Sequence, residues 1–195
     1  GCHNVSPQGA RIAAIEGGGT GRVVIYDLNG RPIQSPDIVG SYVALSPDGQ
    51  QLAVSDANRD ILIVDLASGS VTPLEGASDP SIAEQMPAWS PDASEIAFTR
   101  GMTSGNSWTF EGPCDIYVVP TTGGAARPLE GASGDGFNYY PAFSPDGRWI
   151  SFTRHTTGST TYSAPEAEIF LVPSVGGERR RLAANDAANR QALTD

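Results

Sequence analysis

The sequence predicts an all-β fold, a β-propeller of four-stranded antiparallel blades, from three observations. A short pattern, Ser-Pro-Asp-Gly in its full form, begins at residues 6, 46, 90 and 144, so successive copies lie 40, 44 and 54 residues apart. Each copy is followed by a segment in which apolar and polar residues alternate. A more strongly apolar segment and a glycine turn come next. Repeats of roughly 40–50 residues made of short strands are typical of propeller blades.

The Ser-Pro pattern has the composition of a tight turn. Proline presets φ at the first turn position, aspartate accepts hydrogen bonds from backbone N–H groups ahead of it, and glycine tolerates the left-handed conformation. Asp48, Asp92 and Asp146 occupy the same position in three copies, whereas an active site needs a residue once. We therefore interpret these three aspartates as structural turn residues. Gln8 and Ala93 replace the aspartate and the glycine in the first and third copies, and both changes are tolerable in a turn.

Each repeat then supplies strands in a fixed order. Alternation after the turn predicts a strand with one face in the core, at residues 11–15, 51–55, 95–99 and 149–153. The most apolar strand follows, with both faces expected to be buried, at residues 23–26, 61–64, 116–119 and 169–172. Glycine turns end it at residues 29–30, 68–69, 123–124 and 176–177, and a weaker fourth strand ends at Leu74, Leu129 and Leu182. The innermost strands precede the turns, at residues 43–45, 87–89 and 141–143.

These strands divide the chain into blades. We expect propeller blades over residues 3–182, approximately at 3–40, 41–85, 86–138 and 139–182, and a connector to a further blade or a C-terminal tail at 183–195. Four blades are the low end of the usual range of about 4–8. An open array leaves an apolar blade face at each end. Three hypotheses follow. The chain is part of a larger six- to eight-bladed ring, it closes into a ring with partner chains, or it forms a small four-bladed ring.

Two segments of the chain resemble the repeat of a known protein family. The segments Pro-Ala-Trp-Ser-Pro-Asp (residues 87–92) and Pro-Ala-Phe-Ser-Pro-Asp-Gly-Arg-Trp-Ile-Ser-Phe-Thr-Arg (141–154), followed by Ile-Tyr-Val and Gly-Gly, resemble the WD40-like PD40 repeat of TolB-type bacterial β-propellers. The resemblance covers residues 3 to about 182. It implies the fold specifically. It does not imply one function, since similar blades occur in periplasmic TolB, in prolyl-oligopeptidase-type peptidases and in other envelope proteins.

Charge narrows the range of partners. The net charge of −10 and the pI of about 4.5 argue against nucleic acid and anionic membrane surfaces, which require lysine and arginine to neutralise phosphates. The one basic run, Arg179-Arg180-Arg181, is interpreted as the solvated face of an edge strand, where charge also blocks unwanted strand pairing. No stretch approaches 18 consecutive apolar residues, so no transmembrane segment is predicted.

The two cysteines leave alternatives open. Gly1-Cys2 fits the remnant of a bacterial lipoprotein cleavage site, in which Cys2 carries the lipid anchor, and equally fits a scar glycine followed by an ordinary cysteine. Cys114 is the other cysteine. Two cysteines form neither a metal site nor a disulfide framework, although a Cys2–Cys114 bridge in an oxidising compartment is a further alternative.

Departures from the repeat are the best pointers to function, because scaffold positions repeat and functional loops do not. Long segments separate the second and third strands of the third and fourth blades, at residues 101–114 and 155–167, and the blade-to-blade connections are also long. Aromatic residues with an acidic rim are typical of a protein-binding surface. We therefore predict a partner-binding face made of Trp108, Phe110, Glu111, Phe137, Tyr139 and Tyr162. The alternative is that these rings cover blade tops and fill the channel mouth, with Tyr140 the clearest core residue.

The sequence offers little for catalysis or metal binding. His3 and His155 lie in no metal-binding pattern, and we expect His155 to be a surface-loop histidine. No Gly-x-Ser-x-Gly elbow is present, and the glycine run 17–21 is interpreted as a hairpin loop rather than a phosphate loop. Asp135, between two glycines, is a weak calcium candidate, because it offers one carboxylate where calcium needs about six to eight oxygens. We predict no catalytic residues, no metal and no cofactor.

The leading hypothesis is a non-catalytic scaffold propeller of the Gram-negative cell envelope, similar to TolB and located in the periplasm or anchored to the outer membrane as a lipoprotein. Its partners would be other envelope proteins. The alternative is the gating propeller of a prolyl-oligopeptidase-like serine peptidase whose hydrolase domain is absent from this chain. A weaker alternative is a propeller that binds a small ligand or a glycan through the same aromatic residues.

Overall fold

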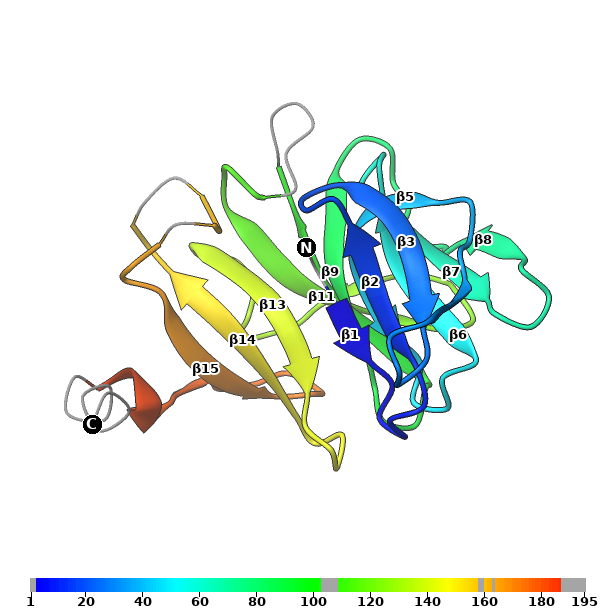
Figure 1. The fold of residues 1–195 in the computed structure, drawn as a ribbon. Helices are drawn as coiled ribbons and strands as arrows, with labels where there is room; N and C mark the ends of the chain where they lie inside the picture. Colours follow the sequence, from blue (N-terminus) through cyan, green and yellow to red (C-terminus); the bar gives the residue numbers. More distant parts are fainter. Residues whose placement is uncertain (1–2, 103–108, 158–159, 163, 187–195) are drawn as a thin grey trace.

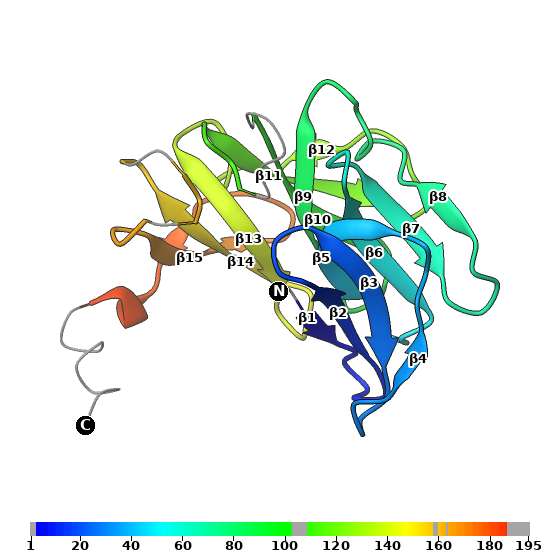
Figure 2. The same cartoon turned by 45° about the horizontal axis from the view of Figure 1, so that its top comes forward.

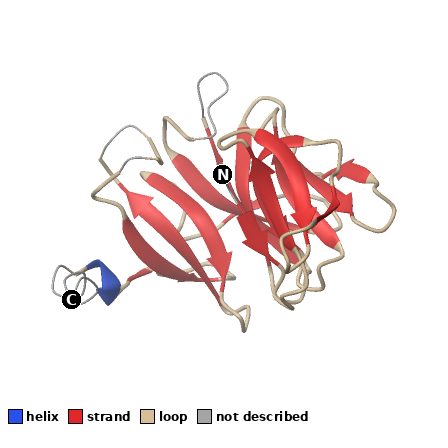
Figure 3. Cartoon of the chain, viewed as in Figure 1, coloured by secondary structure: helices blue, strands red, loops and turns tan. Residues whose placement is uncertain are grey.

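The computed structural model describes residues 3–102, 109–157, 160–162 and 164–186 (Figure 1). Within these ranges the chain is almost entirely strand and loop, with one short helical turn, η1 (Ala183–Asn185), near the C-terminal end (Figure 3). No helix in the described ranges is long and apolar enough to cross a membrane. The predicted all-β fold is confirmed.

The strands form four consecutive four-stranded blades. The first blade contains β1 (His3–Val5), β2 (Ile12–Glu16), β3 (Gly21–Tyr26) and β4 (Pro32–Gln34). The second contains β5 (Val39–Leu45), β6 (Gln51–Asp56), β7 (Ile61–Asp65) and β8 (Val71–Pro73). The third contains β9 (Ala83–Trp89), β10 (Glu95–Gly101), β11 (Cys114–Pro120) and β12 (Arg127–Pro128). The fourth contains β13 (Phe137–Phe143), β14 (Trp149–His155), β15 (Glu168–Pro173) and β16 (Arg180–Arg181).

Neighbouring strands within each blade are antiparallel, and short pairings join the blades in twos. Residues 21–22 of β3 pair with residues 39–40 of β5, and Cys114 of β11 pairs with Phe137 of β13. The innermost strands begin at residues 39, 83 and 137, two or three residues before the expected blade boundaries. The reason is that each of these strands continues through an irregularity in its pairing, at which the alternation of the sequence is interrupted.

The Ser-Pro turns share one hydrogen-bond network. In each turn the backbone N–H of the fourth residue donates to the serine carbonyl, at 2.7–2.9 Å. In the three later blades the serine hydroxyl donates to the aspartate Oδ1 at 2.6 Å, in the pairs Ser46–Asp48, Ser90–Asp92 and Ser144–Asp146. The same hydroxyl accepts from the N–H that opens the next strand, which ties the turn to the hairpin it closes.

The topology places two kinds of connection at opposite ends of the blades. We call the end with the Ser-Pro turns the turn end. We call the other end the insertion end, because it carries the connections between second and third strands and those between blades. In Figure 1 the turn between β13 and β14 lies at the bottom.

Apolar side chains fill the spaces between adjacent blades. Three buried clusters lie between the first and second blades, the second and third, and the third and fourth, and they include Val54, Phe98 and Phe152 respectively. The innermost strands β1, β5, β9 and β13 pack in that order, and no comparable packing among the described strands joins the fourth blade back to the first. The four blades therefore form an open arc (Figures 1 and 2).

Candidate functional site

The long insertions of the third and fourth blades are bonded to each other at the insertion end. The backbone N–H of Phe110 donates to the Thr161 hydroxyl at 3.1 Å, and the N–H of Thr161 donates to the Phe110 carbonyl at 3.1 Å. Both residues are buried, and Phe110 is fully so. We call the described parts of these insertions, residues 109–114 and 155–167 without 158, 159 and 163, the insertion cap. The two reciprocal bonds make it one unit.

A buried aromatic cluster lies beneath the insertion cap. It joins the cap to the innermost strands of three blades, and its members are Tyr42, Ala83, Met86, Phe110, Cys114, Phe137 and Tyr139. His155, at the end of β14, stacks on Phe137 with ring centroids 4.3 Å apart and meets Tyr139 edge-on at 5.6 Å. Burial raises the pKa of Tyr139 to about 12, so its hydroxyl stays protonated at neutral pH.

This arrangement divides the predicted binding face. Phe110, Phe137 and Tyr139 lie in the buried cluster, as expected if the rings covered the blade tops, so these three do not present a surface. Tyr162 is 68% exposed and Glu111 is also exposed, both in the insertion cap. Trp108, another predicted member, lies outside the described residues, as does the lipid-anchor candidate Cys2. The second cysteine, Cys114, is buried, and burial raises the pKa of its thiol.

The expectations for Tyr140 and His155 were wrong. Tyr140 is 42% exposed while its neighbour Tyr139 is buried, because the pairing of β13 is irregular between Tyr139 and Ala142 and Tyr140 has φ of 54°. Because of the bulge, Tyr140 is exposed although it lies next to the inner strand expected at residues 141–143. His155 is 3% exposed rather than on the surface, because β14 extends to it and its ring enters the aromatic cluster. Its Nδ1 lies 2.5 Å from the Thr157 carbonyl oxygen, to which an Nδ1–H would donate.

One position of the innermost strand recurs in the second, third and fourth blades. Tyr42, Met86 and Tyr140 each lie four residues before the serine of the next turn. Met86 and Tyr140 both have left-handed φ, 59° and 54°, and both precede proline. The hydroxyls of Tyr42 and Tyr140 lie 3.3 Å apart, which links the second blade to the fourth. Left-handed backbone at non-glycine residues is strained, and such strain is common where side chains are aimed at a site.

Buried ion pairs support the insertion end. Glu84 on β9 is fully buried and accepts from Arg100 Nε at 2.8 Å and from the backbone N–H of Asp79 at 3.0 Å. Burial raises the pKa of Glu84 even though Arg100 opposes the shift. Arg100 and Arg154 occupy the same position near the end of the second strand in two successive blades, in the repeated run Phe-Thr-Arg. The repeated run is the sequence signal of the shared position of these two arginines.

Asp135 is the centre of a second ion-pair network. Its two carboxylate oxygens accept from Arg179 at 3.1 and 3.2 Å and from Arg154 at 2.5 Å. Hydrogen bonds from Arg179 and Arg154 lower the pKa of Asp135. Two guanidinium groups beside one carboxylate oppose the binding of a calcium ion there. In the described part of the chain, no three His, Cys, Asp or Glu side chains are grouped to hold a metal ion.

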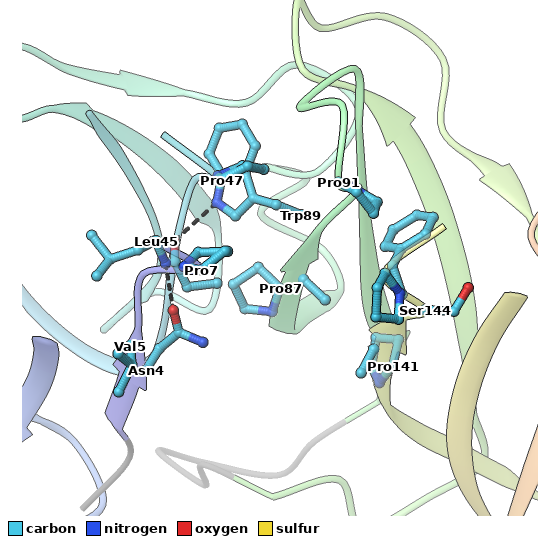
Figure 4. Close-up of a pocket in the computed structure, with 15 residues that line it drawn as sticks. Asn4, Val5, Pro7, Leu45, Pro47, Pro87, Trp89, Pro91, Pro141 and Ser144 are labelled. Carbon is cyan, nitrogen blue, oxygen red and sulfur yellow. Dashed lines mark hydrogen bonds between the residues drawn. The ribbon is translucent and has the colours of Figure 1, made fainter. Parts of the chain in front are cut away.

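The turn end carries structural aspartates and a groove. Asp48, Asp92 and Asp146 accept the hydrogen bonds of their turns. The serine hydroxyl bond is the main cause of a lowered pKa in each, to about 2 for Asp92 and Asp146. Between the innermost strands lies a mainly apolar groove of about 470 Å³, whose lining includes six prolines together with Trp89 and Phe143 (Figure 4). Side chains already cover part of its backbone, since Trp89 Nε1 donates to the Ala44 carbonyl at 2.9 Å and the Leu45 N–H donates to Asn4 at 2.8 Å.

Two known proteins with similar sequences differ in kind. The chain is 30% identical over 142 residues to dipeptidyl-peptidase 5 of Porphyromonas gingivalis, and the match covers 71% of this chain and 18% of that protein. It is 34% identical over 112 residues to the TolB homolog of Chlorobium chlorochromatii, covering 56% of this chain and 22% of that protein. The matches thus span about a fifth of each relative. No protein-family model matches the chain.

Solved structures agree with the fold described above. The putative TolB of Agrobacterium tumefaciens superposes with a TM-score of 0.68 at 24% identity, covering 96% of this chain and 62% of that one. TolB of Acinetobacter baumannii superposes with a TM-score of 0.67 at 19% identity, covering 93% of this chain and 42% of that one. An enzyme, the oligogalacturonate lyase of Vibrio parahaemolyticus, superposes with a TM-score of 0.63 at 13% identity, covering 90% of this chain and 50% of that one. The chain therefore has a TolB-like β-propeller fold, which occurs in enzymes as well as in TolB.

Proposed function

We propose that this chain is the protein-binding part of a non-catalytic, TolB-like propeller of the bacterial cell envelope, and that its contact surface is the insertion cap. The observation that carries the proposal is the pair of hydrogen bonds between Phe110 and Thr161 above a buried aromatic cluster. Those bonds hold two insertions from different blades in one arrangement. A surface that is ordered before binding loses less conformational entropy when the partner docks.

The chemistry of the cap suits a protein partner. The cap exposes the ring of Tyr162 and the carboxylate of Glu111, and Tyr140 and Met102 are further large exposed side chains of the third and fourth blades. Aromatic residues and methionine are enriched at protein interfaces, and tyrosine adds a hydroxyl that can bond at the rim. The buried rings of Phe110, Phe137 and Tyr139 then act as the base of the surface rather than as its contacts.

Other features agree with an envelope location. The similarity to TolB supports a periplasmic location. The net charge of −10 favours protein partners over nucleic acid. Other envelope proteins are accordingly the partners that we propose.

Capture of partners by the purified chain tests this proposal. Wild-type protein, Tyr162→Ala and Glu111→Gln are immobilised and exposed to the envelope fraction of the source bacterium. Val175→Ala serves as the matched control, because Val175 is 84% exposed in the turn between β15 and β16 at the turn end. We expect Tyr162→Ala to lose the proteins that wild type and Val175→Ala both retain. Equal retention by all four proteins would overturn the proposed surface.

A peptidase gate is the second candidate, favoured by the match to dipeptidyl-peptidase 5. In that case the propeller would control access to a hydrolase domain on the same polypeptide. The intact mass of the protein isolated from its source separates the two proposals. A mass near 70 kDa together with a serine-reactive site would favour the gate, and a protein without a serine-reactive site would favour the binding propeller.

A further inference from the structure

The third and fourth blades fill the same pair of positions in their inner hairpins differently. In the third blade Arg100 on β10 lies directly opposite Glu84 on β9, and Arg100 Nε donates to Glu84 Oε1 at 2.8 Å. In the fourth blade Arg154 on β14 lies directly opposite Asn138 on β13. Glu84 and Asn138 each lie six residues before the serine of the next turn, so the two pairs are equivalent. The fourth blade thus has an amide where the third has a carboxylate.

Hydrogen bonds fix the orientation of the Asn138 amide. Its Nδ2 donates to the Asp135 carbonyl at 2.8 Å and to Asp115 Oδ1 at 3.2 Å. A carbonyl oxygen can only accept, so exchanging the amide nitrogen and oxygen of Asn138 would place two acceptors together. The side-chain oxygen of Asn138 is therefore the amide atom that is left for another donor.

Two buried polar atoms of this pair, Asn138 Oδ1 and Arg154 Nε, have no hydrogen-bond partner among the residues that the structure describes. Asn138 is 0% exposed and Arg154 is 7% exposed. Arg154 pairs with Asp135 through a terminal nitrogen at 2.5 Å, which leaves its Nε–H for another acceptor. Residues directly opposite each other in an antiparallel pair carry their side chains on the same face. One buried face of the hairpin therefore holds both an unmatched donor and an unmatched acceptor.

We propose that one buried water molecule binds between Arg154 Nε and Asn138 Oδ1. The Nε–H donates to the water oxygen and the water donates to the amide oxygen, so that both buried atoms are satisfied. An anion would suit the Nε–H but would face the amide oxygen, and a cation would face the guanidinium group. Asparagine is one methylene shorter than glutamate, so the water occupies the place of the carboxylate oxygen that Glu84 presents to Arg100. It adds to the bonds by which β13, β14 and Asp135 are held together at the insertion end.

A high-resolution crystal structure of the purified chain tests the site directly. We expect a water peak at about 2.7–3.2 Å from both Arg154 Nε and Asn138 Oδ1. The third blade is the control within the same crystal, because Arg100 Nε should bond to Glu84 with no water between them. A direct bond between Arg154 Nε and Asn138 would overturn the proposal, and so would well-defined density with no water at this place.

Nuclear magnetic resonance tests the same site in solution. We expect a nuclear Overhauser effect between water and the Nε–H of Arg154 and none for Arg100, with rotating-frame spectra separating this effect from exchange with bulk water. Asn138→Glu should abolish the effect at Arg154, because the longer carboxylate then takes the place of the water. A missing effect in wild type, or one that persists in folded Asn138→Glu, would contradict the proposal. Should circular dichroism find that variant unfolded, the comparison of the two arginines in wild type decides. Partner capture by the insertion cap is a separate property, so the two proposals fail independently.

Discussion

The turn end and the insertion end of the blades differ in what shifts the pKa values of their carboxylates. At the turn end the same Ser-Asp hydrogen bonds recur, and they lower the pKa values of Asp48, Asp92 and Asp146. At the insertion end burial raises the pKa values of Glu84 and Asp115, whereas hydrogen bonds from two arginines lower that of Asp135. One end is an exposed scaffold stabilised by local bonds, and the other is a desolvated assembly of parts distant in sequence. Assemblies of the second kind are where a specific surface can be built.

The largest effect that we expect comes from the base of the insertion cap. Phe110→Ala should lower the free energy of unfolding by about 3–5 kcal/mol, because it removes a fully buried ring and leaves a cavity. Tyr162→Ala, in the same cap but 68% exposed, should change it by less than about 0.5 kcal/mol. Urea unfolding of both variants measures the contrast. Equal and small losses would mean that the cap is not part of the cooperative fold.

A smaller effect tests the bond between the two insertions. Thr161→Val keeps the shape of the side chain but removes the hydroxyl that accepts from the Phe110 N–H, at a cost of about 1–3 kcal/mol for a buried donor left without a partner. Amide hydrogen exchange at Phe110 should also become faster in this variant. Thr156→Val, at an exposed threonine of the same insertion, is the control and should change neither quantity. If amide exchange at Phe110 is unchanged in Thr161→Val, this hydrogen bond does not hold the two insertions together.

The turn end should respond to backbone conformation rather than to burial. Gly49 has φ of 68° and Ala93, at the same turn position, has φ of 60°. Gly49→Ala should lose about 1 kcal/mol because a Cβ disfavours the left-handed region. Its added methyl would meet Ser6 Cβ at an ordinary 3.5 Å, so contact adds no penalty. Ala93→Gly should gain less, about 0.5 kcal/mol, because the methyl of Ala93 packs against the core. Thermal unfolding of the two variants checks the opposite signs.

The pH dependence of stability should have opposite signs for the turn aspartates Asp92 and Asp146 and for the buried Glu84. Asp92 and Asp146 have a pKa of about 2 in the folded protein against an ordinary 3.8, so their contribution is present above pH 3.8 and is lost as the pH falls toward 2. Glu84 has a raised pKa, so the folded state holds its proton more tightly. Its contribution therefore falls as the pH rises from the ordinary value of 4.5 through the folded pKa. Urea unfolding from pH 2 to 7 should show Asp92→Asn flattening the acid limb only. An unchanged acid limb would contradict the turn network.

The comparison also explains what the sequence could predict. Repetition identified the turns at residues 6, 46, 90 and 144 and the apolar third strands, because each depends on local bonds and on packing repeated in every blade. Phe110 and Thr161 are 51 residues apart and have no counterpart in the other blades, so no pattern indicated that they are bonded. The exchange of roles between Tyr139 and Tyr140 follows from a bulge of one residue, which alternation does not reveal.

The central claim is that the insertion end, and not the turn end, contacts partner proteins. A photo-crosslinking residue placed at position 162, and in a second strain at position 175, tests it in living cells of the source bacterium. We predict that position 162 forms discrete crosslinked products with envelope proteins, that Thr161→Val weakens them, and that position 175 yields none of these products. Identical products from both positions, or products from position 175 alone, would contradict the account.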